Sequence, residues 1–337
     1  MSSYANAGVN IAEGNRAVSL MRDAVQSTYT PAVLAGLGAF GGCFDLSKAV
    51  THLNDAILVA STDGVGTKTL VAAACNDYTA IGADLVNHCI NDILVQGARP
   101  LFFLDYIAVD VLKAEQVAAV VQSIAGACRA AGCAILGGET AEMPGVYRDN
   151  TFDVAGTIVG VAQRGAMLPS GVATGDAIIA LPSNGLHTNG YSLARRMVDV
   201  IGGYDATPPA LGGFTVGQAL LAPHRCYIHE YTTLTAANIP IHALAHITGG
   251  GVYDNLPRVL PSGCGALIRR GSWSVPPIFD ILVAAGNISE SDAFHAFNMG
   301  LGMLVVLPAD AVAATLTCLP EARLVGEIVA GEGVTLQ

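Results

Sequence analysis

The chain has 337 residues, a formal net charge of −11 and charged side chains at only 13% of its positions. The acidic balance argues against a nucleic-acid partner, which would call for basic patches, and no apolar run approaches the ~20 residues that span a bilayer. A chain of this length predicts two domains, and so small a charged fraction predicts that part of the surface is buried in an oligomer.

The eight cysteines are scattered and show no C-x-x-C spacing. Most lie in apolar segments, where a free cysteine acts as a small hydrophobic side chain. The N-terminal residues 1–6 lack the basic and apolar regions of a secretion signal. We therefore expect a reduced cytoplasmic protein without disulfides or a zinc site.

The first polar segment predicts an amphipathic helix over residues 15–25 and then a glycine-rich stretch. Residues 36–41 match the pattern G-x-G-x-x-G, but a dinucleotide-binding fingerprint follows a strand and opens a helix. This copy follows Thr30-Pro31 and has no helical pattern behind it. We interpret residues 36–42 as a mobile glycine-rich loop.

Residues 56–60 predict a buried strand, and the segment Ser61–Lys68 follows it directly. Its last six residues, 63–68, supply an acid (Asp63), two glycines, a hydroxyl group and a lysine. Glycines let backbone N–H groups approach an anion, and the acid could hold Mg²⁺ against the same phosphates. Because Thr67 precedes the lysine, the segment is not a Walker A loop. These residues alone favour a phosphate site and a plain turn about equally.

Further acids follow the next predicted strands. The helical region that ends near Gly97 carries Asp92 in an apolar stripe, where a carboxylate needs a partner or a metal. Strands are predicted over residues 100–109 and 133–136, with a helix over 113–131 between them. The acids that follow strands into glycine-containing loops are Asp63, Asp105, Glu139 and Glu142. Because ligands gather at strand ends in α/β folds, these acids together indicate a metal–phosphate site.

A strand over residues 151–163 precedes the predicted domain boundary at 164–171, where periodicity lapses among Pro, Gly and Ser. The second half opens with a strand over 176–181, a polar turn over 182–190 and a helix over 191–200. A glycine-rich turn that enters a helix binds anions, because the first N–H groups of the helix are unpaired. His187 lies in that turn, which favours ligand contact or acid–base work over a buried structural role.

The remainder alternates strands and helices. Predicted strands cover residues 243–248, 266–269, 302–307 and 324–329, and predicted helices cover 226–237, 252–259, 277–285, 292–297 and 309–316. A second anion-type turn, Gly249–Gly251, follows Thr248. We take four other histidines as isolated and structural or exposed: His224, His229, His242 and His295. The segment 298–302 is interpreted as a simple strand entry.

The chain contains neither a G-x-S-x-G elbow nor an H-E-x-x-H motif, so acyl-serine and zinc-protease chemistry lack support. The pattern that remains favours an ATP-like polyphosphate with magnesium, and a second anionic ligand near the helix openings of the second half.

An ordered set of motifs then resembles the phosphoribosylformylglycinamidine cyclo-ligase (AIR synthetase) family of purine biosynthesis. The motifs are residues 61–68, 91–98, 100–106, 137–144, 185–192, 248–251, 255–261 and 297–303, and the match is collinear from residue 4 almost to the C-terminus.

The resemblance implies a cytoplasmic homodimer that uses ATP and Mg²⁺ to close a ring in formylglycinamidine ribonucleotide. It implies an α/β (α+β) fold with two domains. Residues 1–165 would form an ATP-binding and dimerisation domain whose mixed sheet pairs into a barrel with the partner. Residues 166–337 would form the α/β domain on the substrate side.

Site roles carry over from the resemblance by residue. Asp63, Asp92 and Glu139 would bind magnesium. Gly64, Gly66, Thr67 and Lys68 would contact ATP phosphates, and Asp63, Lys68 and His187 would be catalytic. The substrate side would be formed by His187, Thr188, Asn189, Glu142, Thr248, Gly249, Gly250 and Gly251. The glycine loop 36–42 would act as a lid.

The chain also departs from the family at several positions. Asn6 and Asn10 stand where the family carries aspartates, and Arg22 and Gln26 stand where lysines are common. An ATP contact by a lysine of this helix is therefore open, since a guanidinium does not reproduce the geometry of an ammonium group.

Rival interpretations share the ATP site. A selenophosphate synthetase would need a reactive cysteine near the N-terminus, yet the first is Cys43. The hydrogenase-maturation relative ends in an acceptor cysteine, and this chain ends in Gln337. A thiamine-phosphate kinase and a non-catalytic nucleotide-binding scaffold stay open as alternatives.

Overall fold

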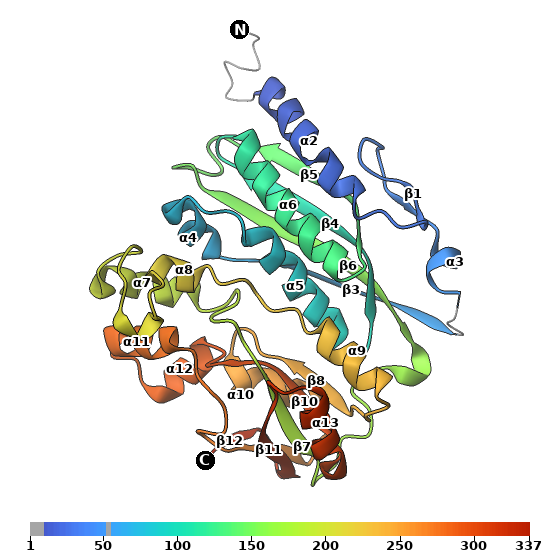
Figure 1. Ribbon diagram of the computed structural model, residues 1–337, viewed down its shortest axis with the longest axis vertical. Coiled ribbons are helices and arrows are strands. Elements are labelled where there is room, and N and C mark those ends of the chain that lie inside the picture. The colour runs from blue at the N-terminus through green and yellow to red at the C-terminus, as the bar shows by residue number, and fades with distance from the viewer. Residues whose placement is uncertain (1–9, 52–54) are drawn as a thin grey trace. The chain divides into compact units, whose positions relative to one another are not determined.

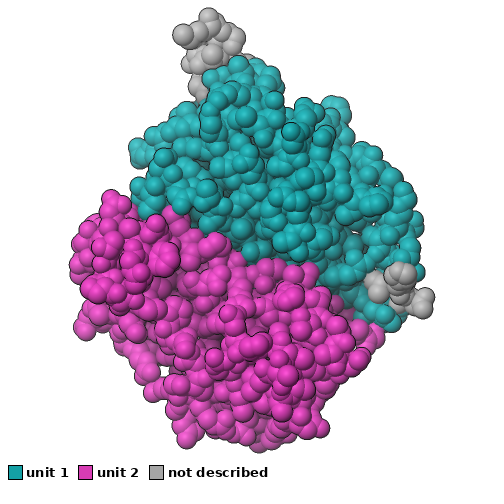
Figure 2. Space-filling view, in the orientation of Figure 1, with its two compact units in different colours: residues 1–93, 98–164 teal, residues 94–97, 165–337 magenta. Residues whose placement is uncertain are grey.

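The computed structural model describes residues 10–51 and 55–337. Asn6 and the other residues of the opening motif up to position 9 lie outside the described residues. The described chain divides into two compact units (Figure 2): residues 1–93 with 98–164, and residues 94–97 with 165–337. Among the described residues, no helix is both long and apolar enough to cross a membrane.

Unit 1 is built on a four-stranded mixed sheet in the order β3-β6-β4-β5. The strands are β3 (Ala56–Gly64), β4 (Arg99–Val109), β5 (Ala134–Glu142) and β6 (Phe152–Gln163). Strand β6 pairs antiparallel with β3 and β4, and β4 pairs parallel with β5. Strands β3, β4 and β5 therefore run in one direction, and their ends lie at the same edge of the sheet.

Helices α2 (Ile11–Gln26), α5 (Ile81–Leu94) and α6 (Ala114–Ala130) lie along one face of this sheet (Figure 1). The helices cover this face because its residues are apolar or small: in β6, Val154, Gly156 and Ile158 are buried under the helices, whereas Asp153 is exposed. Two further helices are α3 (Leu46–Ala49) and α4 (Lys68–Cys75), and the residues 36–42 connect the short strands β1 (Val33–Ala35) and β2 (Cys43–Phe44).

Two predicted loops of unit 1 are strands instead. Strand β3 continues to Gly64 and β5 continues to Glu142, so Asp63, Glu139 and Glu142 lie inside the sheet. The reason is the pairing partner: β6 matches β3 residue by residue as far as Gly64, and β4 matches β5 as far as Glu142. Ladder hydrogen bonds outweigh the low strand propensity of glycine here.

Unit 2 is built on a six-stranded sheet in the order β12-β9-β11-β7-β10-β8. Its strands are β7 (Ala177–Pro182), β8 (Ala243–His246), β9 (Cys264–Ile268), β10 (Leu301–Leu307), β11 (Arg323–Ala330) and β12 (Val334–Leu336). All pairs are antiparallel except β12 with β9. The buried residues of β7, β8 and β10 form the core of this unit.

The helices of unit 2 are α7 (Tyr191–Ile201), α8 (Val216–Leu220), α9 (Ile228–Ala236), α10 (Gly251–Asn255), α11 (Pro277–Gly286), α12 (Glu290–Ala296) and α13 (Val312–Cys318), with 3₁₀ turns at Arg164–Ala166, Pro209–Leu211, Leu256–Val259 and Ala309–Ala311. The end of β7 pairs with the start of β10, and the end of β8 lies two residues further along β10. This topology brings the residues that follow β7 and β8 to one edge of the sheet.

Candidate active site

The segment Ser61–Lys68 leaves the sheet through a tight turn. Gly66 has φ +56°, and a Cβ on Gly64 would lie 2.9 Å from the carbonyl oxygen of Val154. Both glycines are therefore required by the backbone. Helix α4 begins at Lys68, so the N–H groups of its first turn face the turn that precedes it.

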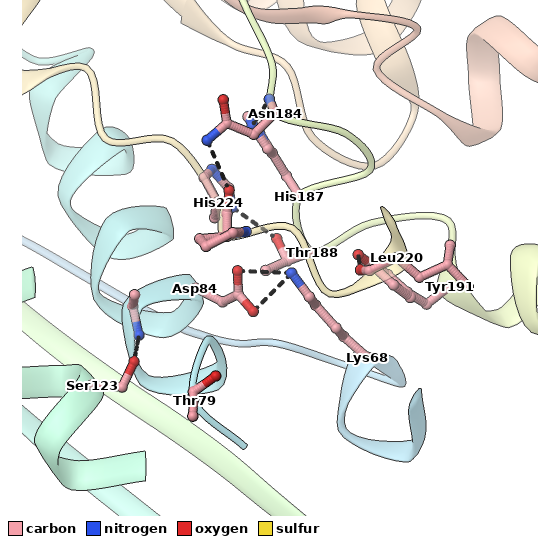
Figure 3. Close-up of polar contacts among 12 residues, drawn as sticks. Lys68, Thr79, Asp84, Ser123, Asn184, His187, Thr188, Tyr191, Leu220 and His224 are labelled. Atoms are coloured by element: carbon pink, nitrogen blue, oxygen red, sulfur yellow. Dashed lines mark hydrogen bonds and ion pairs between the residues drawn. The ribbon is translucent and has the colours of Figure 1, made fainter. Parts of the chain in front are cut away.

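Lys68 itself is fully buried. Its ammonium group lies 2.8 Å from both carboxylate oxygens of Asp84 in α5 (Figure 3). Burial lowers the pKa of Lys68, and the charge of Asp84 opposes that shift. The lysine predicted to contact phosphates is thus held in an ion pair that joins α4 to α5.

His88 connects the two predicted metal-binding aspartates. Its Nε2 lies 2.9 Å from Asp63 and 3.7 Å from Asp92, and the hydroxyl group of Ser61 donates to Asp92 at 3.0 Å. Burial alone would lower the pKa of His88, but the hydrogen bond with Asp63 and the charges of both aspartates outweigh it and raise the pKa. The structure therefore brings Asp63 and Asp92 to one histidine.

Sequence reasoning missed His88 and Asp84, although a signal was present. Asp84, His88 and Asp92 recur at intervals of four residues on one face of α5. Three titratable side chains in register on one helix indicate a shared polar site.

The two predicted glutamates lie elsewhere. Glu139 pairs in register with Tyr106 on β5, and two strands separate β5 from the strand of Asp63, a span of about 14 Å. Within one chain, Glu139 does not join Asp63 and Asp92. Glu142 accepts the backbone N–H groups of Asn10 (2.6 Å) and Leu112 (2.7 Å). These bonds occupy both its oxygens, so its evident role is to fix the segments that lead into α2 and α6.

In unit 2, the turn after β7 places His187 in a left-handed conformation, with φ +62°. Its Nε2 accepts the backbone N–H groups of Asn184 (3.2 Å) and Arg225 (3.4 Å). His224 is buried and not isolated as predicted: its ring stacks on His187 with centroids 4.0 Å apart. It also contacts the hydroxyl group of Thr188 at 3.3 Å (Figure 3).

The third member of this cluster is His246 at the end of β8, whose Nε2 lies 3.0 Å from that of His224. One nitrogen atom from each of His187, His224 and His246 lies within 4.8 Å of the others, close enough to suggest a metal. An imidazole binds a metal in its ring plane, however, and the planes of His187 and His224 are only 21° apart in a stack. One ion cannot lie in both planes, so we interpret the cluster as a hydrogen-bonded stack.

The glycine turn of unit 2 lies beside this cluster. A Cβ on Gly249 would approach the side-chain oxygen of Asn189 to 3.2 Å, so the two predicted substrate turns are neighbours. Asn255 fixes the glycine turn by donating to the carbonyl groups of Gly249 (3.1 Å) and Gly251 (2.7 Å) and contacts Thr248 at 3.2 Å.

The segment 298–302, interpreted from sequence as a simple strand entry, also belongs to the site. The buried amide of Asn298 donates to the carbonyl group of Gly185 at 2.8 Å and accepts from Ser183 and from the N–H group of Gly300, both at 2.9 Å. These three bonds join the turn after β7 to the start of β10.

Comparison with known proteins follows the same division. The N-terminal domain of AIR synthase related proteins matches residues 47–162, and the C-terminal domain of the same group matches residues 173–337. Phosphoribosylformylglycinamidine cyclo-ligase of Geobacillus sp. (strain WCH70) is 45% identical over 344 residues, which span 99% of this chain and 97% of the relative. The chain belongs to the AIR synthase family.

Solved structures share the fold of this AIR synthase family member at lower identity. Thiamine-monophosphate kinase from Stenotrophomonas maltophilia K279a has a TM-score of 0.66 at 17% identity, with 94% of this chain and 96% of the kinase covered. The hydrogenase maturation protein HypE in complex with ATP has a TM-score of 0.62 at 20% identity, with 94% and 86% covered.

Proposed function

We propose that this protein catalyses the ATP-dependent cyclisation of formylglycinamidine ribonucleotide to aminoimidazole ribonucleotide, with release of ADP and phosphate. The observation that carries the proposal is the 45% identity to a cyclo-ligase across nearly the whole of both chains. The two clusters described above, one charged and one neutral, suit a reaction that needs a polyphosphate and a second ligand.

The chemistry begins with an amide oxygen, which is a poor leaving group. The formyl oxygen attacks the γ-phosphorus of ATP, ADP leaves, and the formamide nitrogen loses its proton to give an iminophosphate. The amidine nitrogen then attacks the activated carbon of this iminophosphate, phosphate leaves with that oxygen, and the nitrogen loses a proton. In phosphoryl transfer the protein mainly positions the reactants and neutralises charge.

Unit 1 would bind the phosphates of ATP. The N–H groups of Gly66 and Thr67 and those at the start of α4 suit anionic oxygens. Lys68 supports this turn from inside, because its pair with Asp84 fixes the first residue of α4. In this proposal it acts as a positioning residue.

Asp63 and Asp92 would hold Mg²⁺, which would supply charge neutralisation for the phosphates. Carboxylate oxygens are the ligands that magnesium prefers, and 47% of the Asp63 side chain and 26% of the Asp92 side chain are exposed. These two residues fit the ion, whereas Glu139 of the same chain does not join them.

Unit 2 would bind the ribonucleotide through the turn of His187, Thr188 and Asn189 and the neighbouring residues 248–251. The stack of His187 on His224 and the bonds of Asn298 hold these turns in place. His187 stays our candidate for acid–base work.

A homodimer completes the proposal. The sheet face of unit 1 opposite α5 and α6 carries Leu58, which is 58% exposed, and Tyr106, which is 39% exposed. Covering such a face with a second copy would bury apolar area and form the barrel that the family resemblance implies. All eight cysteines are free, which supports a reducing, cytoplasmic setting.

The test is ADP release that depends on formylglycinamidine ribonucleotide, with thiamine monophosphate as the rival substrate. Asp63→Ala should lower turnover at least 100-fold, roughly the loss seen for transition-state charge stabilisers. The matched control is Asp153→Ala, because Asp153 also accepts the N–H group of its following residue but lies outside the site. Turnover of thiamine monophosphate alone, or full activity of Asp63→Ala, would overturn the proposal.

A further inference from the structure

The glycine turn of unit 2, residues 248–251, has a carboxyl group against its backbone. A Cβ built on Gly250 would lie 2.3 Å from Oδ2 of Asp254, which belongs to the following helix, α10. Gly250 also has φ +87°, a conformation that favours glycine. The side chain of Asp254 therefore folds back over Gly250. Its negative charge lies at a turn that the sequence predicts to bind an anion.

The backbone of this turn is largely occupied by internal hydrogen bonds. Asn255 donates to the carbonyl groups of Gly249 and Gly251. The carbonyl group of Gly250 accepts the N–H group of Asp254 at 3.3 Å. Helix α10 has only five residues, and so few aligned peptide units add little positive potential at its start. The carboxylate therefore dominates the electrostatic potential of the turn.

No cation of the described residues, 10–51 and 55–337, forms an ion pair with Asp254, whose side chain is exposed. Arg258 stands four residues further along, which is the spacing of a helical ion pair. Helix α10 ends at Asn255, however, and a 3₁₀ turn follows it. Arg258 instead lines a cavity with Pro169 and Pro261. The charge of Asp254 is thus available to a ligand.

This carboxylate borders the proposed ribonucleotide site. Gly249 adjoins Gly250, and a Cβ on Gly249 would approach the side-chain oxygen of Asn189 to 3.2 Å. Asn189 belongs to the turn of His187, which lies in the same unit. A ligand seated between the two turns would therefore meet the carboxylate of Asp254 at one end.

The proposed substrate carries charges of both signs, on opposite sides of its ribose. The phosphate is anionic, whereas an amidine is a strong base and holds a proton near neutral pH. An amidinium group presents two N–H groups side by side, and a carboxylate binds such a pair through two parallel charge-assisted hydrogen bonds. The same carboxylate repels a phosphate.

We propose that Asp254 recognises the amidinium group of the ribonucleotide and thereby orients the substrate in unit 2. Its two oxygens would accept N–H groups from both amidine nitrogens, and the phosphate would point away from residues 248–251. The inference rests on the proposed cyclisation and adds the residue that distinguishes an amidine from a neutral amide.

The experiment is calorimetric titration of the full-length protein with formylglycinamidine ribonucleotide and with formylglycinamide ribonucleotide, which has a neutral amide in place of the amidine. Without ATP no ring closes, so binding alone is measured. The wild type should bind the amidine roughly tenfold more tightly, the scale of a hydrogen bond to a charged group. Asp254→Asn keeps the shape without the charge and should bring the two affinities within about threefold of each other.

Two further variants separate amidine recognition from other effects. Asp254→Glu keeps the charge and should retain a preference of at least about threefold. Asp310→Asn makes the same change at an exposed aspartate that follows the far end of β10, and it should keep the full preference. Thermal unfolding of each variant verifies that it folds.

Two more measurements respond to recognition and not to a structural role. Binding the cation is a ground-state interaction, so Asp254→Asn should raise KM for the amidine roughly tenfold and change kcat less than about threefold. Raising the salt concentration to about 0.5 M should reduce the preference of the wild type for the amidine, because salt screens exposed charges. That measurement needs no variant.

A wild type that binds the amidine and the amide equally would overturn the inference, as would an unchanged preference in Asp254→Asn. An equal loss of preference in Asp310→Asn would also overturn it, because the loss would then reflect overall charge. If the wild type closes the ring while Asp254→Asn keeps the preference, only the role of Asp254 fails. If Asp254 selects the amidine but no ADP is released with it, only the proposed reaction fails.

Discussion

The turn after β3 in unit 1 and the turn after β7 in unit 2 are both polar, glycine-containing and followed by a helix, yet they are held in different ways. Around the turn after β3, titratable groups form ion pairs: Lys68 pairs with Asp84, and His88 pairs with Asp63. Around the second, neutral groups dominate, as in the three hydrogen bonds of Asn298 and the stack of His187 on His224.

This difference shows how the same local sequence pattern can prepare two kinds of site. A charged network tolerates the arrival of a polyphosphate and a cation, because its members can exchange partners. A neutral network fixes shape, and its members are costly to displace because each buried polar group needs its own partner. The two turns should therefore respond differently to mutation, pH and substitution of charge.

The largest effect is expected from Lys68→Met. It leaves Asp84 buried without its cation, and breaking a buried ion pair in this way costs about 3–5 kcal/mol. The measurement is the free energy of unfolding in urea. The control is Arg164→Met, which breaks the exposed pair with Asp55 and should cost less than about 1 kcal/mol.

The double variant Lys68→Met/Asp84→Leu sharpens this prediction. Replacing both partners by apolar side chains removes the unpaired charge, so stability should recover most of the loss. Equal losses in Lys68→Met and Arg164→Met would show that the buried pair has no special importance for unit 1.

The next largest effect is expected from Asn298→Ala in unit 2. The substitution leaves the buried carbonyl group of Gly185 and N–H group of Gly300 without their partner, at a cost of about 2–3 kcal/mol. The control is Asn184→Ala, because that amide donates to Pro223 from a less buried position of the same turn. An equal loss in the control would contradict the neutral-network interpretation.

Sequence reasoning found the polar turns and most of the helices and strands because these are local patterns. It found Asp92 because a carboxylate interrupts an apolar stripe. It missed the roles of His224, His246 and Asn298 because they depend on pairing between distant strands. The order β7-β10-β8 places Pro182 opposite Leu301 and His246 opposite Met303, and no local signal in a single sequence specifies that register.

The ion pair of Lys68 with Asp84 was missed for a different reason. A lysine that follows two glycines is a candidate for a phosphate contact, and only the fold shows that its ammonium group lies 2.8 Å from Asp84. Residue type and spacing specify what a side chain can bind, whereas packing decides which partner it has. Glu139 illustrates the same point, because sheet order alone separates it from Asp63.

The smallest effect tests whether the charged turn depends on pH. The pKa of His88 is raised in the folded protein. The imidazolium therefore stabilises the fold fully at pH values below the ordinary histidine pKa of about 6.5. This stabilisation is lost as the pH rises through the folded-state pKa of His88. The free energy lost in His88→Asn should be larger at pH 5.5 than at pH 9, by about 0.5–1 kcal/mol, because Asp63 is half exposed. His295→Asn is the control, since His295 contacts the carbonyl group of Ser291 and not a carboxylate. Urea titrations at both pH values measure the difference. If His88→Asn loses the same free energy of unfolding at both pH values, the imidazole binds Asp63 as a neutral hydrogen-bond donor. The two turns would then be held in the same way, by neutral groups.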